Sequence, residues 1–300
     1  QTPVHHLKRN NLRMIDKEVL SRLHFLQENL RYTGIFMFQK TIGFRMFFFT
    51  SLVLIGVFVF FPLLWMINTA LKPAELTFSL AFFSTTPTLE NFQNVLKDKR
   101  ILIYLGNSLT VASISCILSM VVASLAAYSF SKFRYRGRRS LMVTIMISQA
   151  FPHAILLLTI YTVMRNVGLL DNYLSLILSF ITFTLPTSTW MLKSYFDQIP
   201  DALMESAKID GAGRVKIMTR IVMPLAVPGL ISVAIYGFVW AWNDLLYSLT
   251  LVTSADKRTL APGLILTYMG EFTTNWAEMM AASILVSLPV TLIFIFLQRY

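Results

Sequence analysis

Six long apolar stretches constrain this chain more than any other feature. Each has about the 20 mostly apolar residues that a helix needs to cross the hydrocarbon core of a bilayer. Only 14% of its 300 residues are charged, against roughly 25% in soluble domains. The chain is therefore predicted to be all-α, a polytopic membrane protein with six transmembrane helices. The predicted spans are residues 46–68, 104–130, 141–164, 173–192, 225–252 and 278–297.

The positive charges predict how these spans are oriented. Of the 26 Lys and Arg residues, 19 fall in the N-terminal tail, after the second span, after the fourth span and at the C-terminus. Cytoplasmic loops carry the excess of Lys and Arg, so both termini are predicted to be cytoplasmic. The net charge of +11 is then a consequence of topology, and nucleic-acid binding is the weaker interpretation.

The chain divides by composition into a tail and a bundle. Residues 1–44 carry one apolar helical stripe with basic residues opposite, which predicts a cytoplasmic amphipathic segment on the membrane surface or against a partner. Residues 45–300 form the predicted permease domain. In its second span, small residues on one face predict close helix packing: Ser108, Ala112, Ser115, Ser119, Ala123 and Ala126.

Prolines lie within most of the predicted spans. A proline frees a backbone carbonyl, which a neighbouring helix or a water-filled cavity must satisfy. Ordinary kinks and a pathway lined by irregular helices are both open interpretations. The residues are Pro62, Pro152, Pro186, Pro228 and Pro289.

A charged cytoplasmic loop, residues 194–224, separates the fourth and fifth spans. Pro200 and Asp201 are typical of a helix start. Gly211 permits a left-handed turn, and a second short helix is expected to begin at Gly213. Two short helices joined by glycine predict an L-shaped knob, which suits docking into another protein better than a solvated linker would. The knob is expected to display Leu203, Met204 and Ala207, with Glu205, Lys208 and Asp210 beside them.

The knob resembles the EAA signature of permease subunits of binding-protein-dependent ABC importers. That signature reads E-A-A, three residues, G, nine residues, I-x-L-P. Two mild departures are Ser206 for the middle alanine and Met223 for the leucine. The matching residues are Glu205, Ser206, Ala207, Asp210, Gly211, Ala212, Ile221 and Pro224.

Further residues resemble the carbohydrate, maltose-type branch of these permeases. They are Ile209 to Ala212, Trp242-Asn243-Asp244, and Gln298-Arg299-Tyr300. The resemblance covers about residues 45–300 and implies an ABC importer type I permease fold. It also implies a location in the bacterial cytoplasmic (inner) membrane.

The resemblance implies a division of labour among subunits. Residues 200–213 would couple this chain to a separate ATPase, through Leu203, Met204, Glu205, Ser206, Ala207, Asp210, Gly211 and Ala212. The chain has no G-x-x-x-x-G-K-[ST] sequence, so it is expected to have no catalytic residue, cofactor or metal of its own. ATP and magnesium would bind to two partner ATPase subunits. The other implied partners are a second homologous permease, a periplasmic or lipid-anchored solute-binding protein, and membrane lipid.

Two further groups of residues are candidates for contact with the substrate or the binding protein. The fifth span gathers aromatic and polar side chains that suit a sugar pathway: Trp240, Trp242, Asn243, Asp244 and Tyr247. An acid at membrane depth indicates function by default. The resemblance also makes residues 254–277 a periplasmic loop that reaches into the binding protein, with Tyr268, Gly270, Asn275 and Trp276 as candidates. An ordinary interfacial loop with an aromatic anchor is the alternative.

The expected function is transport of an oligosaccharide, with alginate oligosaccharides as one candidate because the basic tail resembles that of alginate-importer permeases. An ABC permease for a polyamine, phosphate or peptide is the alternative within the family. A self-contained secondary transporter or membrane enzyme is disfavoured, because such proteins need paired intramembrane acids or a histidine relay. The spans contain only an isolated Asp244 and, at an edge, Glu278.

Overall fold

The structure is a computed structural model that describes residues 42–77, 79, 86–270 and 274–297. The chain divides into two compact units, residues 1–64 and 65–300, and each is considered by itself. Helix α2 (Ile42–Ala70) runs across the division at residue 64, and its part in the first unit presents long apolar side chains that are exposed, such as Phe58 at 81%. The predicted amphipathic segment, residues 1–44, lies almost wholly outside the described residues, as does the motif at Gln298–Tyr300.

The second unit is helical, and the described residues contain no strand beyond an isolated bridge between Met269 and Thr274. This confirms the all-α prediction. The helices that follow α2 are η1 (Ala74–Leu76), α3 (Glu90–Lys97), α4 (Lys99–Lys132), α5 (Arg138–Ile147), η2 (Ser148–Ala150), α6 (His153–Asn166), α7 (Tyr173–Asp197), α8 (Asp201–Ile209), α9 (Arg214–Ile217), η3 (Met218–Val222), α10 (Met223–Leu225), α11 (Val227–Trp242), α12 (Leu246–Leu251), η4 (Ala255–Lys257), α13 (Leu260–Tyr268) and α14 (Trp276–Leu297).

Four of the six predicted spans are single long helices: α2, α4, α7 and α14. The third and fifth are broken. The two helical stretches 138–150 and 153–166 meet at 99°, and the stretches 214–225 and 227–242 meet at 81°. Six spans result if each bent pair counts as one. The helix is interrupted within 141–164 at residues 151–152, and within 225–252 at residues 243–245.

Prolines account for both bends. Phe151, which precedes Pro152, has an extended ψ of 129°, because a residue before proline is disfavoured in the helical region. Pro228 lies at the second position of α11, and the chain leaves helical geometry just before it, at Ala226. Three other prolines lie inside continuous helices without ending them: Pro62, Pro186 and Pro289.

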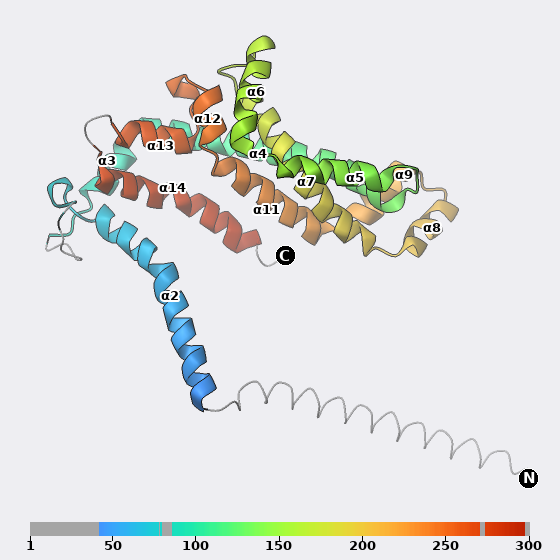
Figure 1. Ribbon diagram of the computed structural model, residues 1–300, viewed down its shortest axis with the longest axis horizontal. Helices are drawn as coiled ribbons and strands as arrows, with labels where there is room; N and C mark the ends of the chain where they lie inside the picture. The colour runs from blue at the N-terminus through green and yellow to red at the C-terminus, as the bar shows by residue number, and fades with distance from the viewer. Residues whose placement is uncertain (1–41, 78, 80–85, 271–273, 298–300) are drawn as a thin grey trace, which may run out of the picture. The chain divides into compact units, whose positions relative to one another are not determined.

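Helix α4 is the centre of the second unit and packs chiefly against α7 and α11 (Figure 1). Its small residues lie at these contacts, which confirms the packing prediction. Ser119 Oγ lies 2.9 Å from Thr184 Oγ1 on α7, and Cys116 Sγ donates to the Ala234 carbonyl on α11 at 3.2 Å. Small side chains allow the helices to approach closely enough for these contacts.

The contact between α11 and α7 can be tested at a glycine. A Cβ atom at Gly229 would lie 2.5 Å from ring atoms of Tyr195, whereas one at Gly106 on α4 would meet nothing within 4 Å. We expect Gly229→Ala to lower the free energy of unfolding by about 1–3 kcal/mol through overpacking. Gly106→Ala, the matched control, is expected to be neutral or stabilising, because alanine favours a helix.

The measurement is the temperature at which half of the detergent-purified chain has unfolded. It is followed by heating samples and then measuring the remaining folded protein by size-exclusion chromatography. Equal midpoints for the two variants would contradict the close packing of α11 on Tyr195.

Candidate functional site

The knob lies at one end of the bundle, beside the C-terminal ends of α4 and α7 (Figure 1). Helix α8 ends at Ile209, and Gly211 has a left-handed φ of 77°. Ala212 N donates to the Ala207 carbonyl at 2.9 Å, and Gly211 N donates to the Lys208 carbonyl at 3.0 Å. These two bonds form a Schellman motif, which satisfies the last carbonyls of the helix. The predicted helix–glycine–helix turn is confirmed.

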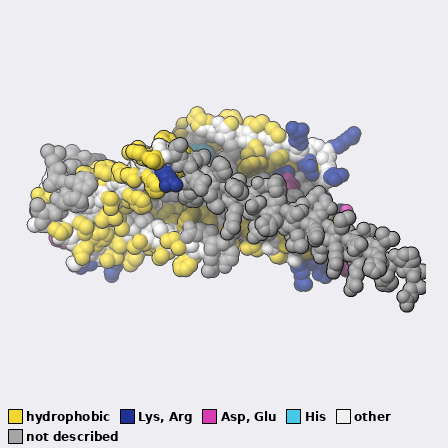
Figure 2. Space-filling view, turned by 90° about the horizontal axis from the view of Figure 1, so that it is seen from below, with side chains coloured by type: hydrophobic (Ala, Val, Ile, Leu, Met, Phe, Trp, Pro, Cys, Tyr) yellow, Lys and Arg dark blue, Asp and Glu magenta, His cyan; other side chains and the backbone are white. Residues whose placement is uncertain are grey.

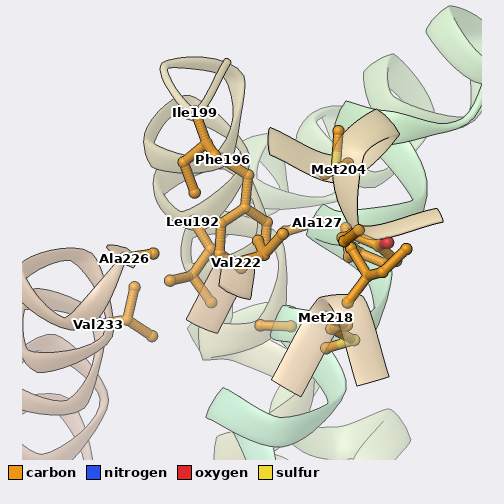
Figure 3. Close-up of a cluster of buried hydrophobic side chains, with 13 residues drawn as sticks. Ala127, Leu192, Phe196, Ile199, Met204, Met218, Val222, Ala226 and Val233 are labelled. Atoms are coloured by element: carbon orange, nitrogen blue, oxygen red, sulfur yellow. The ribbon is translucent and has the colours of Figure 1, made fainter. Parts of the chain in front are cut away.

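One face of the knob belongs to the core of the bundle (Figure 3). Met204 and Ala207 are only 6% and 8% exposed. They join a cluster of apolar side chains from α4, α7, η3 and α11, in which Leu192, Phe196 and Val222 are fully buried. The expectation that Met204 and Ala207 are displayed is therefore wrong, because they anchor the knob to its own bundle.

The opposite face of the knob is exposed and mixed in character. Ile209 and Val215 are 87% and 76% exposed, and Leu203 is 45% exposed. Ala212 is half-buried. Five of the coupling candidates are exposed: Leu203, Glu205, Ser206, Asp210 and Gly211. The neighbouring Lys208 is exposed as well. A knob with one anchored face and one free apolar and charged face can be gripped without coming loose from the bundle.

A residue that the sequence analysis missed fixes the knob to α4. Lys132, the last residue of α4, donates to the Ile199 carbonyl at 2.7 Å and to Asp201 Oδ1 at 2.9 Å. Its side chain is 6% exposed. The Lys132 ammonium lowers the pKa of Asp201 by hydrogen bonding, so the carboxylate stays ionised. One cation thus joins the end of α4 to the start of α8.

The second arm of the knob also meets the end of α4. The Arg214 guanidinium lies 5.2 Å from the centre of the Phe133 ring, within cation–π range. Phe133 packs edge-on against Tyr128, and its carbonyl accepts from Arg138 at 3.1 Å. No pattern in a single sequence pairs residues so distant along the chain. The only available signal was that Lys132 and Phe133 end a long apolar span.

The fifth span contributes a hollow of about 420 Å³ lined by Tyr236, Val239, Trp240, Asn243 and Asp244. Three of the predicted pathway residues therefore lie together. Asp244 Oδ1 accepts from Ser248 N at 2.9 Å, and Trp240 packs against the rings of Phe180 and Phe183. An aromatic ring beside an amide and a carboxylate can stack on and hydrogen-bond to a polyhydroxylated ligand.

The other two predicted pathway residues point into the protein. Trp242 is 9% exposed and stacks on Phe238. Tyr247 is 1% exposed and its hydroxyl donates to the His153 carbonyl at 2.6 Å. Both side chains are buried where α11 ends at Trp242 and the chain turns into α12, and their part in a substrate pathway stays a prediction.

Most of the predicted outer loop is helical. Residues 255–257 and 260–268 form η4 and α13. Tyr268 is buried at 6% exposure, and Asn275 Oδ1 accepts from Glu278 N at 3.1 Å as the cap of α14. Both residues thus take part in the packing of this segment, and its contact with a binding protein stays a prediction.

All four candidates of this segment, Tyr268, Gly270, Asn275 and Trp276, line one cavity of about 530 Å³, which Asn94 and Glu278 also line. Asn94 Nδ2 donates to Glu278 Oε1 at 2.9 Å, which ties α3 to α14. Helix α3 and the start of α14, which contribute to this lining, lie at the end of the bundle opposite α8 and α9 (Figure 1).

A second polar network holds the same end of the bundle together. Asp171, with a φ of 56°, accepts from Ser254 N at 2.8 Å and pairs with Lys257 at 3.1 Å. Hydrogen bonds from Ser254, the largest cause, and from Lys257 hold the pKa of Asp171 far below its usual range. In the described part of the chain, no three His, Cys, Asp or Glu side chains gather as a metal site.

The fold and these surfaces define a polytopic membrane protein with a partly exposed knob at one end. Residues 115–300 match the family described as "Binding-protein-dependent transport system inner membrane component". The chain belongs to this family, which confirms the resemblance seen in the EAA signature.

Known relatives and a solved structure agree with this assignment. The chain is 31% identical to a diacetylchitobiose uptake system permease of Streptomyces coelicolor, over 82% of this chain and 90% of that protein. It is also 31% identical to a trehalose/maltose transport permease of Thermococcus litoralis, over 83% and 90%. The crystal structure of a bacterial ABC transporter involved in alginate import superposes with a TM-score of 0.76 and 22% identity. That superposition covers 87% of this chain and 98% of the other and confirms the importer permease fold.

The contact between Lys132 and the knob can be tested on this chain alone. Lys132→Met removes a charged hydrogen bond to the Ile199 carbonyl, which should cost about 1–3 kcal/mol. We expect trypsin to cleave the knob, at the exposed Lys208 and Arg214, about tenfold faster, because cleavage follows the population of the loosened state. Lys132→Arg keeps the cation and should cleave at nearly the original rate.

The matched control is Lys99→Met, an exposed lysine at the other end of α4. If cleavage in the knob were unchanged by Lys132→Met, or rose equally with Lys99→Met, Lys132 would have no part in fixing the knob.

Proposed function

We propose that this chain is one permease subunit of an ATP-driven ABC importer for carbohydrates. The observation that carries the proposal is the two-sided knob. Its Met204 face is locked into the bundle, while Ile209, Val215 and the charged residues of the EAA signature are exposed. Exposed apolar side chains surrounded by charged ones are typical of a surface that binds another protein.

The partner at the knob is a separate ATPase subunit, present twice in the complex. The 300-residue sequence has no phosphate-loop motif, so ATP and magnesium are bound by those subunits, and this chain carries no catalytic residue. A second homologous permease completes the pathway. A periplasmic or lipid-anchored binding protein delivers the solute, in keeping with the family description.

The proposed location is the bacterial inner membrane, with the knob and both termini in the cytoplasm. Lys and Arg side chains gather at the end of the bundle that carries α8 and α9 (Figure 2). The positive-inside rule places such an end in the cytoplasm. The cavity of about 530 Å³ and the Asp171 network then face the periplasm. The binding protein docks there, near Gly270 and Trp276.

The mechanism follows from the attachments of the knob. Closure of the ATPase dimer moves α8, and Lys132 and the buried Met204 carry that movement into α4 and the rest of the bundle. A ligand shifts a conformational equilibrium only by its different affinities for the two states. ATP provides that difference at the ATPase subunits, and the knob transmits it, so the pathway alternates between inward-facing and outward-facing states.

Carbohydrate is the substrate class that the relatives favour over a polyamine, phosphate or peptide, because those reported above are named for chitobiose, trehalose and maltose. The fold neighbour is named for alginate, an acidic polysaccharide. The hollow at Trp240 holds the carboxylate of Asp244 and has no Lys or Arg in its lining. An acidic oligosaccharide would need its counter-charges on the second permease, so a neutral sugar suits this half of the pathway better.

The coupling role is tested at Gly211 with a matched glycine. A Cβ atom would meet nothing within 4 Å at either Gly211 or Gly213, but only Gly211 has a left-handed φ. Gly211→Val therefore adds about 1–3 kcal/mol of backbone strain without a clash. We expect it to reduce substrate-stimulated ATP hydrolysis of the reconstituted complex several-fold, and Gly213→Val to leave it nearly unchanged.

Glu205→Lys reverses a charge on the exposed face and is expected to lower ATP hydrolysis in the same assay. Normal hydrolysis and transport by both Gly211→Val and Glu205→Lys would exclude the knob as the coupling element.

The hollow is tested at Trp240. Loss of a stacking ring costs about 0.5–1.5 kcal/mol, so Trp240→Ala should lower sugar uptake into proteoliposomes about 2–10-fold at unchanged affinity of the binding protein. Trp190→Ala removes a 53% exposed tryptophan from α7 and serves as the control. Equal uptake by the two variants would remove Trp240 from the pathway.

A further inference from the structure

A small basic hollow near the knob has no role in the coupling mechanism. It lies between α4, α5 and α7 and has a volume of about 210 Å³. Its lining consists of three cations and three apolar side chains: Phe130, Arg138, Arg139, Met142, Val143 and Lys193. The lining contains no carboxylate.

The three cations are held in different ways. Arg138 donates to the Phe133 carbonyl at 3.1 Å. This acceptor is a neutral carbonyl, so the bond does not neutralise the positive charge of Arg138. Lys193 pairs with Asp197, four residues later on α7. Asp197 also accepts from Ser131 at 2.7 Å. Arg139 is exposed. With one carboxylate against three cations, the hollow keeps a net positive charge.

Apolar surface continues directly from the hollow along α5. Phe130, Met142 and Val143 form its apolar side, and Val143 and Ile147, one turn apart on α5, are 48% and 58% exposed. Helix α5 begins after Gly137, which has no side chain to cap it, and has no acid in its first turn. The helix dipole therefore adds to the attraction of an anion there.

We propose that this hollow binds the phosphate of an anionic phospholipid, whose acyl chain lies along the exposed apolar face of α5. Basic hollows between membrane helices on the cytoplasmic side bind anionic headgroups. A free phosphate would use the three cations but would leave the apolar floor and the α5 face unmatched. This lipid site is independent of which solute the transporter carries.

The site has a structural consequence for the neighbouring contact between Phe133 and Arg214. Arg138 bonds the Phe133 carbonyl, and Phe133 receives Arg214 of the knob on its ring. A phosphate held by Arg138 and Arg139 fixes the start of α5 against the end of α4. An anionic lipid at this point therefore steadies the part of α4 on which the knob rests.

The experiment uses the full transporter complex in nanodiscs of phosphatidylcholine that contain a minor fraction of phosphatidylglycerol. The retained phosphatidylglycerol is counted by native mass spectrometry after detergent extraction. A cation near an anionic lipid is worth about fivefold in affinity. We therefore expect Arg138→Gln/Arg139→Gln to lower retention by an order of magnitude or more. Arg134→Gln/Arg136→Gln is the matched control, since it removes two exposed arginines of the same segment that do not line the hollow.

Because Arg138 also bonds Phe133, the single variant Arg139→Gln is measured as well and should lower retention about fivefold. Equal retention by the hollow and control variants would overturn the proposal. Displacement of the lipid by millimolar inorganic phosphate would also overturn it, since that result indicates an anion site without lipid. Loss of the ATPase subunits from the Arg138/Arg139 variant with phosphatidylglycerol retention unchanged would show a subunit contact instead.

Discussion

The buried ammonium of Lys132 fixes how the end of the bundle that carries the knob is arranged. A charge removed from water must be paired and hydrogen-bonded, and Lys132 finds both partners, the Ile199 carbonyl and Asp201, where α8 begins. The end of α4 and the start of α8 are therefore held in one register. Since α4 packs against α7 and α11, a movement of the knob reaches three long helices at once.

The knob has one buried face, and the proposed docking role depends on it. Met204 and Ala207, three residues apart, lie on one side of α8 and join the core. Ile209, near the end of the helix, and Val215, beyond the turn, stay exposed. A knob attached only through its connecting chain would move independently of the bundle, and its movement would not be transmitted to the long helices. The buried side chains make it a rigid extension of the bundle, with Gly211 setting the angle between its arms.

The sequence predicted what local chemistry decides. The apolar stretches predicted the helical class, and Gly211 after a capped helix predicted the turn of the knob. The face of α8 could not be predicted, because Leu203, Met204, Ala207 and Ile209 offer two overlapping apolar sets and only the neighbouring helices choose between them.

Prediction failed most at long-range contacts. Whether Trp240 or Trp242 reaches the surface depends on how α11 packs, and the ion pair from Lys132 to Asp201 joins residues far apart in the chain. Both are decided by tertiary packing. For the same reason the breaks before Pro152 and Pro228 could not be separated from the tolerated prolines at Pro186 and Pro289, since all share the same local chemistry.

Helix α11 connects the two ends of the proposed mechanism. It starts just after the 81° bend that follows the knob and ends beside the hollow at Trp240 and Asp244. The π-helical turn over Met218–Val222 and the bend at Ala226 are the irregular backbone of this path, and irregular turns of this kind often mark functional positions. The close contact of Gly229 with Tyr195 keeps α11 seated on α7. In the proposed mechanism, a rotation that enters at the knob would therefore turn α11 and α7 together, and it would move the hollow, whose lining comes from residues 236–244.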